Sequence, residues 1–337
     1  MLESIYVCRH GFRLSWETQL WTPPTGIPRD PPLSKHGVDQ AKELAHFLRQ
    51  EFGLDAGATP PADVAILSSP LYRCVQTATP VADALDLPIL IEPGLGEWYL
   101  PVRRGLHPAL AEPALLQKHF PRVSTSPEAW SPLLTPPRVG ESMRAIHHRA
   151  AQFAPLLAAE LDRRGYTRAI VFTHAATAIA LCRALAGDVR PGDQVLSQGA
   201  TEPGQAEQLG LWKDKERLFV SAATCSASKF TRRAEGAAAG TSSASDAAAW
   251  DREWDGRTDF LERGEERRWD FTFVEEIAED GIDEATGKEI SATKSDAYKD
   301  LPTAAPHESA GHVAREANGQ GQGGQAGQAP APVEGKL

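Results

Sequence analysis

The chain has 337 residues, enough for one large domain or two ordinary ones, and its 41% of hydrophobic residues supports a sizeable core. Its formal net charge of −10 argues against binding nucleic acid through a general basic surface, while leaving room for a local basic pocket. The N-terminus lacks the pattern of a secretory signal, and no run approaches the ~18 apolar residues of a membrane span. We therefore expect no direct contact with nucleic acid and none with a membrane.

Strand-like and helix-like patterns alternate over the first two thirds of the chain. Strands are predicted at residues 5–8, 64–67, 88–91, 168–173 and 217–224, and helices at 35–53, 70–85, 140–162 and 175–186. Pro155 inside the third helix predicts a kink or break there. The alternation predicts an α/β fold with a doubly wound, mostly parallel sheet flanked by helices.

The domain organisation follows from composition. Residues 1–285 are predicted to form one domain, in which the proline-rich residues 95–138 are an insertion over the active-site edge and residues 234–249 are a flexible excursion. The alternating residues Trp269–Val274 predict a strand at the sheet edge. Residues 286–337 hold almost no large apolar side chains, so we expect a disordered, low-complexity tail.

The cysteines indicate a reducing environment. Cys8, Cys74, Cys182 and Cys225 show neither a Cys-x-x-Cys spacing nor a pairing with histidine that would indicate zinc. We therefore expect reduced, buried thiols and a cytoplasmic and/or nuclear protein. No cluster of Asp and Glu indicates a metal, and we expect no cofactor.

The tripeptide Arg9-His10-Gly11 comes directly after the first predicted strand. In open α/β sheets, ligands bind at the carboxyl ends of the strands. Gly11 lets the backbone turn away from the strand and approach a ligand closely. An imidazole beside a guanidinium suits an oxyanion such as phosphate.

Three other chemical groups follow predicted strands in the same way. Arg73 begins the helix after strand 64–67, which is a favourable place for an anion. Glu97 lies in the loop after strand 88–91, and His174 follows strand 168–173. The sequence therefore predicts that these groups meet His10 at one edge of the sheet.

These motifs together resemble the histidine phosphatase superfamily, also called phosphoglycerate mutase-like. The resemblance rests on Arg9-His10-Gly11, Leu33-Ser34-x-x-Gly37-x-x-Gln40-Ala41, Ser69-Pro70-Leu71-x-Arg73-x-x-Gln76-Thr77-Ala78, Gly140-Glu141-Ser142 with Arg149, and Thr173-His174-Ala175. The most similar branch is the fungal one that includes the phosphatase-like tau subunit of transcription factor TFIIIC and its shorter paralogue. That branch is indicated by Gly94–Tyr99, by Ala223-Thr224-Cys225-Ser226 and by the segment Asp259–Phe271.

The residue types predict hydrolysis of a phosphomonoester by nucleophilic catalysis. His10 would attack phosphorus and carry the phosphoryl group, while Arg9, Arg13 and Arg73 disfavour its imidazolium form. Arg9, Arg73 and His174 would hold the equatorial oxygens of the transition state, and Arg13 would add to phosphate binding. Glu97 would protonate the leaving group and then activate water.

Several alternatives remain open at this point. Glu17, Glu92 and Glu141 compete with Glu97 as the acid, and Arg13 could be an ordinary solvated arginine. Gly140-Glu141-Ser142 is first interpreted as a helix cap. Trp16 stands where many relatives carry an asparagine that contacts phosphate, and Arg13 could compensate. The residues around the acid differ from those of phosphoglycerate mutases, which disfavours a mutase.

Two functions are therefore predicted. The first is a metal-independent phosphatase whose substrate is a phosphoprotein or a small phosphorylated metabolite. The alternative is a non-catalytic or weakly active scaffold subunit of the RNA polymerase III factor TFIIIC, with other TFIIIC subunits as its partners.

Overall fold

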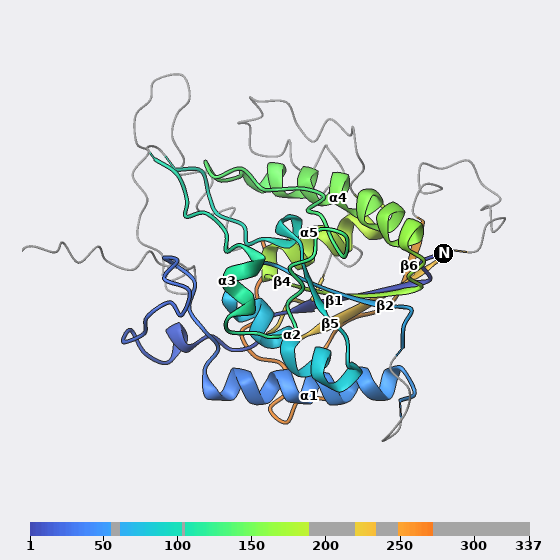
Figure 1. Ribbon diagram of the computed structural model, residues 1–337, viewed down its shortest axis with the longest axis horizontal. Helices are drawn as coiled ribbons and strands as arrows, with labels where there is room; N and C mark the ends of the chain where they lie inside the picture. The colour runs from blue at the N-terminus through green and yellow to red at the C-terminus, as the bar shows by residue number, and fades with distance from the viewer. Residues whose placement is uncertain (55–60, 103–104, 189–219, 234–248, 272–337) are drawn as a thin grey trace, which may run out of the picture. The chain divides into compact units, whose positions relative to one another are not determined.

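A six-stranded sheet in the order β3-β2-β4-β1-β5-β6 carries the fold of the computed structural model (Figure 1). The structure describes residues 1–54, 61–102, 105–188, 220–233 and 249–271, all within the unit Met1–Thr303. The elements are β1 (Ser4–Arg9), η1 (Leu14–Trp16), α1 (Lys35–Glu51), β2 (Val64–Ser68), α2 (Tyr72–Leu85), β3 (Ile89–Ile91), η2 (Pro93–Leu95), α3 (Pro113–Gln117), α4 (Met143–Arg164), β4 (Arg168–Thr173), α5 (Ala175–Leu185), β5 (Ala227–Arg232) and β6 (Trp250–Arg257).

The sheet is mostly parallel, as predicted. β3, β2, β4 and β1 run in the same direction, and β5 and β6 add an antiparallel edge beside β1. β1 is in register with β4 from Ser4–Arg168 to Arg9–Thr173. Arg9 and Thr173 therefore end side by side, and the residues that follow them emerge at the same edge of the sheet.

Helices cover both faces of this sheet (Figure 1). Ile5 and Val7 of β1 pack in a core cluster with α4 and α5, whereas Tyr6 and Cys8 pack in a second cluster with α1 and α2. Burial on both faces explains why the parallel strands read as continuous apolar runs in the sequence. All four cysteines are buried and free, as predicted. Among the described residues, no helix is both long and apolar enough to cross a bilayer.

The strand predicted at residues 217–224 is wrong over its described part, because residues 220–224 form a loop and the strand is β5, a few residues later. The backbone of this loop forms hydrogen bonds with groups outside the sheet instead of with a neighbouring strand. The Ala222 carbonyl accepts a hydrogen bond from the Arg9 guanidinium, and the Thr224 N–H donates to Glu266 O at 3.0 Å. Cys225, at φ 52°, then turns the chain into β5.

The predicted edge strand at 269–274 is also wrong over residues 269–271, which are irregular. Trp269 and Phe271 instead pack as side chains against Trp98, with ring centroids 6.2 and 5.5 Å from it. The edge strand is β6, whose polar sequence did not predict it. Residues 272–274, the excursion at 234–248 and the tail at 286–337 lie outside the described residues.

Helix α4 runs through Pro155 without the predicted break. Pro155 faces outward, while Phe153 and Leu157 on either side are buried in the core and hold the helix in place. At its start, the Ser142 side chain accepts a hydrogen bond from Ala145 N at 3.2 Å. Gly140-Glu141-Ser142 therefore caps this helix, as predicted.

Candidate active site

The carboxyl ends of the parallel strands bring the predicted site residues together. His10 directly follows β1, and its N–H donates to the carbonyl of Thr173, the last residue of β4. His174 is the N-cap of α5, and Arg73 lies in the first turn of α2. Glu97 follows η2, the short helix after β3.

Gly11 is required by close packing at the turn after β1. A Cβ atom at this position would lie 2.7 Å from the carbonyl oxygen of Gly37, which is closer than real Cβ atoms come. The Gly11 N–H donates to Thr77 Oγ1 at 3.1 Å, and the next N–H, of Phe12, donates to Gln40 Oε1 at 3.0 Å. The turn that carries His10 is therefore fixed to both α1 and α2.

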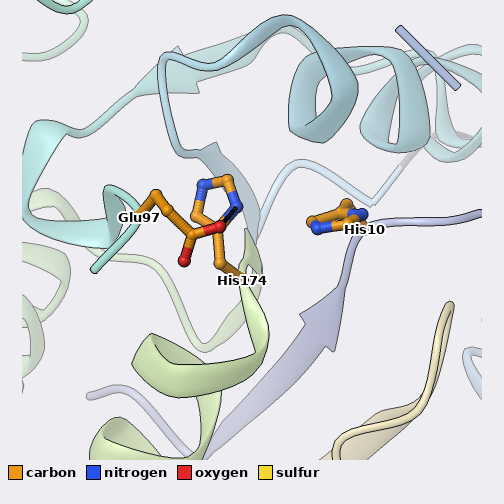
Figure 2. A group of neighbouring side chains, drawn as sticks. All are labelled: His10, Glu97 and His174. Carbon is orange, nitrogen blue, oxygen red and sulfur yellow. Dashed lines mark ion pairs between the residues drawn. The ribbon is translucent and has the colours of Figure 1, made fainter. Parts of the chain in front are cut away.

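His10, Glu97 and His174 converge on one point (Figure 2). One ligand atom from each lies within 4.8 Å of the others, and the two imidazole centroids are 5.4 Å apart. Glu97 Oε2 lies 3.3 Å from His174 Nδ1. Such a set could hold a cation, but Arg9, Arg13 and Arg73 beside it favour an anion instead.

The hydrogen bonding of His10 defines its tautomer. Its Nδ1 lies 2.8 Å from the carbonyl oxygen of Gly11, which can only accept, so Nδ1 carries the proton. Burial lowers the pKa of His10 well below its usual value, and the charges of Arg73, Arg9, His174 and Arg13 lower it further. The imidazole is therefore neutral, with an unprotonated Nε2, which is the form of a nucleophile.

The Arg73 guanidinium joins the other groups of the site. Its Nη2 donates to Glu97 Oε2 at 3.1 Å and lies 3.1 Å from His174 Nδ1. Its Nη1 contacts Asp30 Oδ1 at 3.3 Å. Arg73 is 1% exposed, so its charge acts in surroundings that screen it poorly.

Glu97 is ionised in this arrangement. Burial raises the pKa of the Glu97 carboxyl, but His174, Arg73 and Arg13 outweigh it and hold that pKa well below its usual range. The Trp98 N–H donates to Oε1 of Glu97 at 3.0 Å and fixes the carboxylate further.

His174 is neutral near pH 7 because burial lowers its pKa to about 4, with Glu97 opposing and Arg73 and Arg13 reinforcing the shift. Its Nε2 lies 2.8 Å from Ser69 Oγ. The second histidine is thus oriented from both ring nitrogens, by Ser69 on one side and by Arg73 with Glu97 on the other.

Arg13 is buried, which contradicts the alternative that it is an ordinary solvated arginine. Its Cζ lies 4.2 Å from the centroid of the Trp16 ring. Arg13 is therefore in contact with Trp16, the residue that stands where many relatives carry asparagine.

The Nη1 of Arg9 donates to the carbonyls of Ala222 and Arg267. Burial lowers the pKa of Arg9 to about 10 and that of Arg13 to about 9.

Among the described residues, the buried side-chain nitrogens without a hydrogen-bond partner include Nε of Arg9, Arg13 and Arg73. A buried donor without a partner costs free energy, and three crowded guanidiniums repel each other. A bound oxyanion would relieve the repulsion. The electrostatics of the site therefore favour a phosphate-like ligand.

The competing acids are bound elsewhere. Glu92 accepts from the N–H of Gly94 and from Nε1 of Trp130, at 2.7 and 3.0 Å, and so anchors the loops after β3. Glu141 forms two hydrogen bonds of 2.8 Å with Arg149, and Glu17 is exposed. Of the four acids considered, Glu97 is the one whose contacts lie in this site.

Sequence reasoning missed Asp30, Ser69 and Arg267. Asp30 lies three residues before Leu33, the first residue of the motif that ends at Ala41. Its closeness to that motif could have indicated that it lies near the site. Ser69 opens a motif that was quoted, but its contact with His174 has no sequence signal. Arg267 lies in the segment Asp259–Phe271, whose pattern indicated the branch but gave no sign that this residue lies near Arg9.

Comparisons with known proteins agree with this geometry. A family model, the histidine phosphatase superfamily (branch 1), matches residues 5–195. The transcription factor tau 55 kDa subunit of Saccharomyces cerevisiae is 34% identical over 295 residues, which cover 83% of this chain and 61% of the yeast protein. The ubiquitin-associated and SH3 domain-containing protein A of Mus musculus is 34% identical over 125 residues, covering 28% of this chain and 19% of the mouse protein.

The chain therefore spans about three fifths of the yeast relative's length. Among solved structures, the ecdysone phosphate phosphatase from Bombix mori, in complex with tungstate, superposes with a TM-score of 0.51 at 18% identity. The alignment covers 81% of this chain and 99% of that one. This likeness shows a shared fold.

Proposed function

The chain belongs to the histidine phosphatase superfamily, and we propose that it hydrolyses phosphomonoesters through a phosphohistidine on His10. The observation that carries this proposal is the state of His10. Its imidazole is neutral, its Nε2 is unprotonated, and it faces Glu97 and His174 among buried arginines. A neutral imidazole attacks phosphorus without needing a metal ion to activate it.

The reaction has two balanced steps. In the first, a bond forms between His10 Nε2 and phosphorus while the bond from phosphorus to the leaving oxygen breaks, and Glu97 gives that oxygen a proton. In the second, water attacks phosphorus, the N–P bond breaks and Glu97 takes a proton from the water. Phosphate leaves with Glu97 protonated as it was at the start of the first step, and Glu97 then releases this proton to the solution.

The charged residues around His10 would stabilise the transition state. Charge on a transferring phosphoryl group lies on its three equatorial oxygens. Arg73 and His174 adjoin Glu97 and so surround the same point, and Arg9 and Arg13 add positive charge nearby. Because all four are buried and held by other contacts, little reorganisation accompanies the reaction.

Glu97 must gain a proton before it can act as an acid. In the structure its carboxylate is ionised, which suits the second step directly. A phosphate dianion bound beside it would offset the arginine charges and raise the pKa of Glu97. We expect the proton to reach Glu97 only with bound substrate, from the solution or from a monoanionic ester.

The test is a comparison of two histidine variants. His10→Ala should abolish turnover of an aryl phosphate and the acid-labile label that a 32P-phosphorylated substrate leaves on the protein. His46→Ala, in which a histidine of α1 outside the site is removed, is the matched control and should retain both. Folded His10→Ala protein that keeps turnover, or an unlabelled wild type that turns over, would exclude the phosphohistidine.

A second candidate function is supported by the similarity to the yeast tau subunit over most of this chain. In this proposal the domain is a weakly active or non-catalytic subunit of the RNA polymerase III factor TFIIIC, located in the nucleus. Co-precipitation of the other TFIIIC subunits with the tagged full chain tests it. Equal recovery with wild type and His10→Ala, together with no turnover by wild type, would favour the scaffold. A phosphatase acting on a phosphoprotein or a small metabolite predicts turnover whether or not those subunits are recovered.

A further inference from the structure

Two segments that lie beyond the family match at residues 5–195 bond to the end of β1 and to His10. One is the loop at residues 220–226, and the other is the irregular stretch at residues 258–271. The Cys225 N–H of the loop donates to the His10 carbonyl at 3.2 Å, and the Arg9 N–H donates to the carbonyl of Ser226 at 3.0 Å. The edge of the sheet that carries His10 is therefore built partly by residues outside the matched family model.

The Arg9 guanidinium is held by one carbonyl from each of these segments. Its Nη1 donates to the carbonyl of Ala222 and to that of Arg267, the latter at 2.6 Å. Both hydrogens of Nη1 are thereby used, so the donors left for an anion are those of Nη2 and of the buried Nε. Because a guanidinium presents its N–H groups in a rigid, planar fork, the two carbonyls determine where those remaining donors point.

Arg267 supplies its carbonyl from an unusual backbone conformation. Its φ is 51°, in the left-handed region that is unfavourable for a non-glycine residue and persists only where surrounding contacts hold it. The preceding residue, Glu266, makes such contacts. Its carbonyl accepts from the Thr224 N–H at 3.0 Å and from Thr224 Oγ1 at 3.3 Å. The two segments are thus bonded to each other close to the carbonyls that hold Arg9.

The side chain of Glu266 fastens both segments to α1. Its Oε2 accepts from Gln40 Nε2 at 2.8 Å and contacts His36 Nε2. Gln40 Nε2 also donates to Thr224 Oγ1 at 3.2 Å, while Gln40 Oε1 accepts from the Phe12 N–H at 3.0 Å. One carboxylate therefore connects residues 258–271 and the loop at residues 220–226 to the helix that fixes the turn after β1.

We propose that Glu266 is a positioning residue for Arg9. Its carboxylate holds residues 258–271 against α1, so that the Arg267 carbonyl reaches Nη1 of Arg9 and keeps the guanidinium directed at the phosphoryl group carried by His10. This inference rests on the phosphate site of the proposed function. It makes residues 258–271 a part of that site, which they serve through their main chain.

The test is a double-mutant cycle that combines Glu266→Ala with Arg9→Met, a change that keeps the length of the side chain and removes the guanidinium. Binding of inorganic phosphate, followed by 31P NMR titration, gives one readout that needs no turnover. The kcat/KM for an aryl phosphate gives a second. Glu266→Gln keeps an oxygen that can accept from Gln40 and is the conservative variant. Glu262→Ala removes an exposed acid of the same segment and is the matched control.

Glu266→Ala should bind phosphate about tenfold more weakly than wild type, the size expected of one misdirected hydrogen bond between charged groups. Removal of a negative charge near an anion site would by itself tighten phosphate binding, so the direction of the change separates positioning from a simple effect of charge. Glu266→Gln should lose less than Glu266→Ala, and Glu262→Ala should bind as wild type does.

The cycle identifies Arg9 as the group that Glu266 positions. In the Arg9→Met background, Glu266→Ala should cause little further loss in phosphate binding or in kcat/KM, because the guanidinium is already gone. Arg9→Gln provides a second background for the same comparison. A general loss of stability would instead lower both quantities equally in either background, and thermal unfolding of each variant measures that loss separately.

Unchanged phosphate binding by folded Glu266→Ala overturns the inference, as do equal losses with and without the Arg9 guanidinium. The proposed function fails in a different way. If no aryl phosphate turnover depends on His10 and phosphate does not bind to wild type, the hydrolase proposal and this inference fall together. If turnover depends on His10 but Glu266→Ala binds phosphate as wild type does, only this inference falls.

Discussion

The carboxylate of Asp30 lies 3.3 Å from Nη1 of Arg73, and the two side chains are 2% and 1% exposed. Both oxygens of Asp30 also accept from the Tyr72 N–H, at 3.0 and 2.9 Å, at the first turn of α2. A residue of the long loop before α1 therefore fixes the arginine that contacts Glu97 and His174. In the proposed reaction Asp30 would act on phosphate through Arg73, as a positioning residue.

Asp30→Asn should weaken this contact, because an amide carries no charge to hold the guanidinium. A misplaced catalytic group typically lowers rates by up to about a hundredfold, so kcat/KM for an aryl phosphate should fall roughly 10- to 100-fold. The inhibition constant of inorganic phosphate should rise with it. Asp39→Asn, at an exposed position of α1 paired with Lys35 and Lys42, is the control. An unchanged phosphate inhibition constant in folded Asp30→Asn protein would contradict the positioning role.

Glu97→Gln should slow substrates with poor leaving groups far more than those with good ones. A nitrophenolate departs with little help, whereas a serine or sugar alkoxide needs the proton in the transition state. General acid catalysis contributes about 10²–10⁴-fold, so the gap between the two substrate types should approach that size. Single-turnover rates with both substrates measure this gap. The control is Glu17→Gln, which changes an exposed glutamate that the sequence had left as an alternative acid. An equal loss on both substrates would show that Glu97 only positions its loop.

His147 should make stability depend on pH. It is buried between α4 and α5, where its Nδ1 donates to Met143 O at 2.7 Å and its Nε2 accepts from Arg183 Nη1 at 2.9 Å. Burial first, and then the charge of Arg183, lower the pKa of His147 to about 4. The unfolded chain therefore binds more protons between pH 6.5 and 4, so the stabilisation present above pH 6.5 is lost as pH falls through 4.

That loss amounts to about 3 kcal/mol for His147, because its pKa of about 4 lies below the ordinary histidine value of 6.5. Urea unfolding at a series of pH values measures how the free energy of unfolding depends on pH. This dependence should be weaker in His147→Gln than in wild type, and the contributions of His10 and His174 to it should remain. The exposed variant His119→Gln should keep the wild-type slope. Parallel curves for His147→Gln and wild type would show that His147 titrates normally in the folded protein.

Two truncations should behave differently. Ending the chain after residue 285 should leave turnover and melting temperature unchanged, because the residues removed hold almost no large apolar side chains. Ending it after residue 263 removes the Arg267 carbonyl from Arg9 and the buried Phe271 from the core. The shorter chain should lose turnover and melt at a lower temperature. Thermal unfolding and an aryl phosphate assay are measured on both truncated proteins. A cooperative loss of stability in the chain that ends after residue 285 would show that the removed tail packs against the domain.

The parallel part of the fold could be predicted because each strand is buried on both faces. The apolar runs that became β1, β2, β3 and β4 lie within a residue or two of their predicted bounds. The antiparallel edge could not be predicted in the same way. β6 reads Trp-Asp-Arg-Glu-Trp-Asp-Gly-Arg, in which charged residues outnumber apolar ones, so neither alternation nor hydrophobicity marks it as a strand.

Prediction of the site from the sequence has the same limit. The positions of Arg9, His10, Arg73, Glu97 and His174 followed from strands that end at one edge of a parallel sheet. Asp30, Ser69 and Arg267 are placed by tertiary contacts between segments far apart in the sequence. Such contacts depend on how loops fold back over the sheet, and no local pattern of residue types encodes them.

The position of β1 inside the sheet affects how the chain folds while it is being synthesised. β1 is made before both of its neighbours, β4 and β5, which pair with it from Ser4–Arg168 and from Ser4–Thr231. A growing chain therefore carries the strand before His10 with both hydrogen-bonding edges unpaired until most of the domain has left the ribosome. Unpaired edges of this kind attract other chains. Chains that stop before β5 should consequently aggregate through β1, so that the strand on which the proposed chemistry depends is also the one most exposed to misassembly.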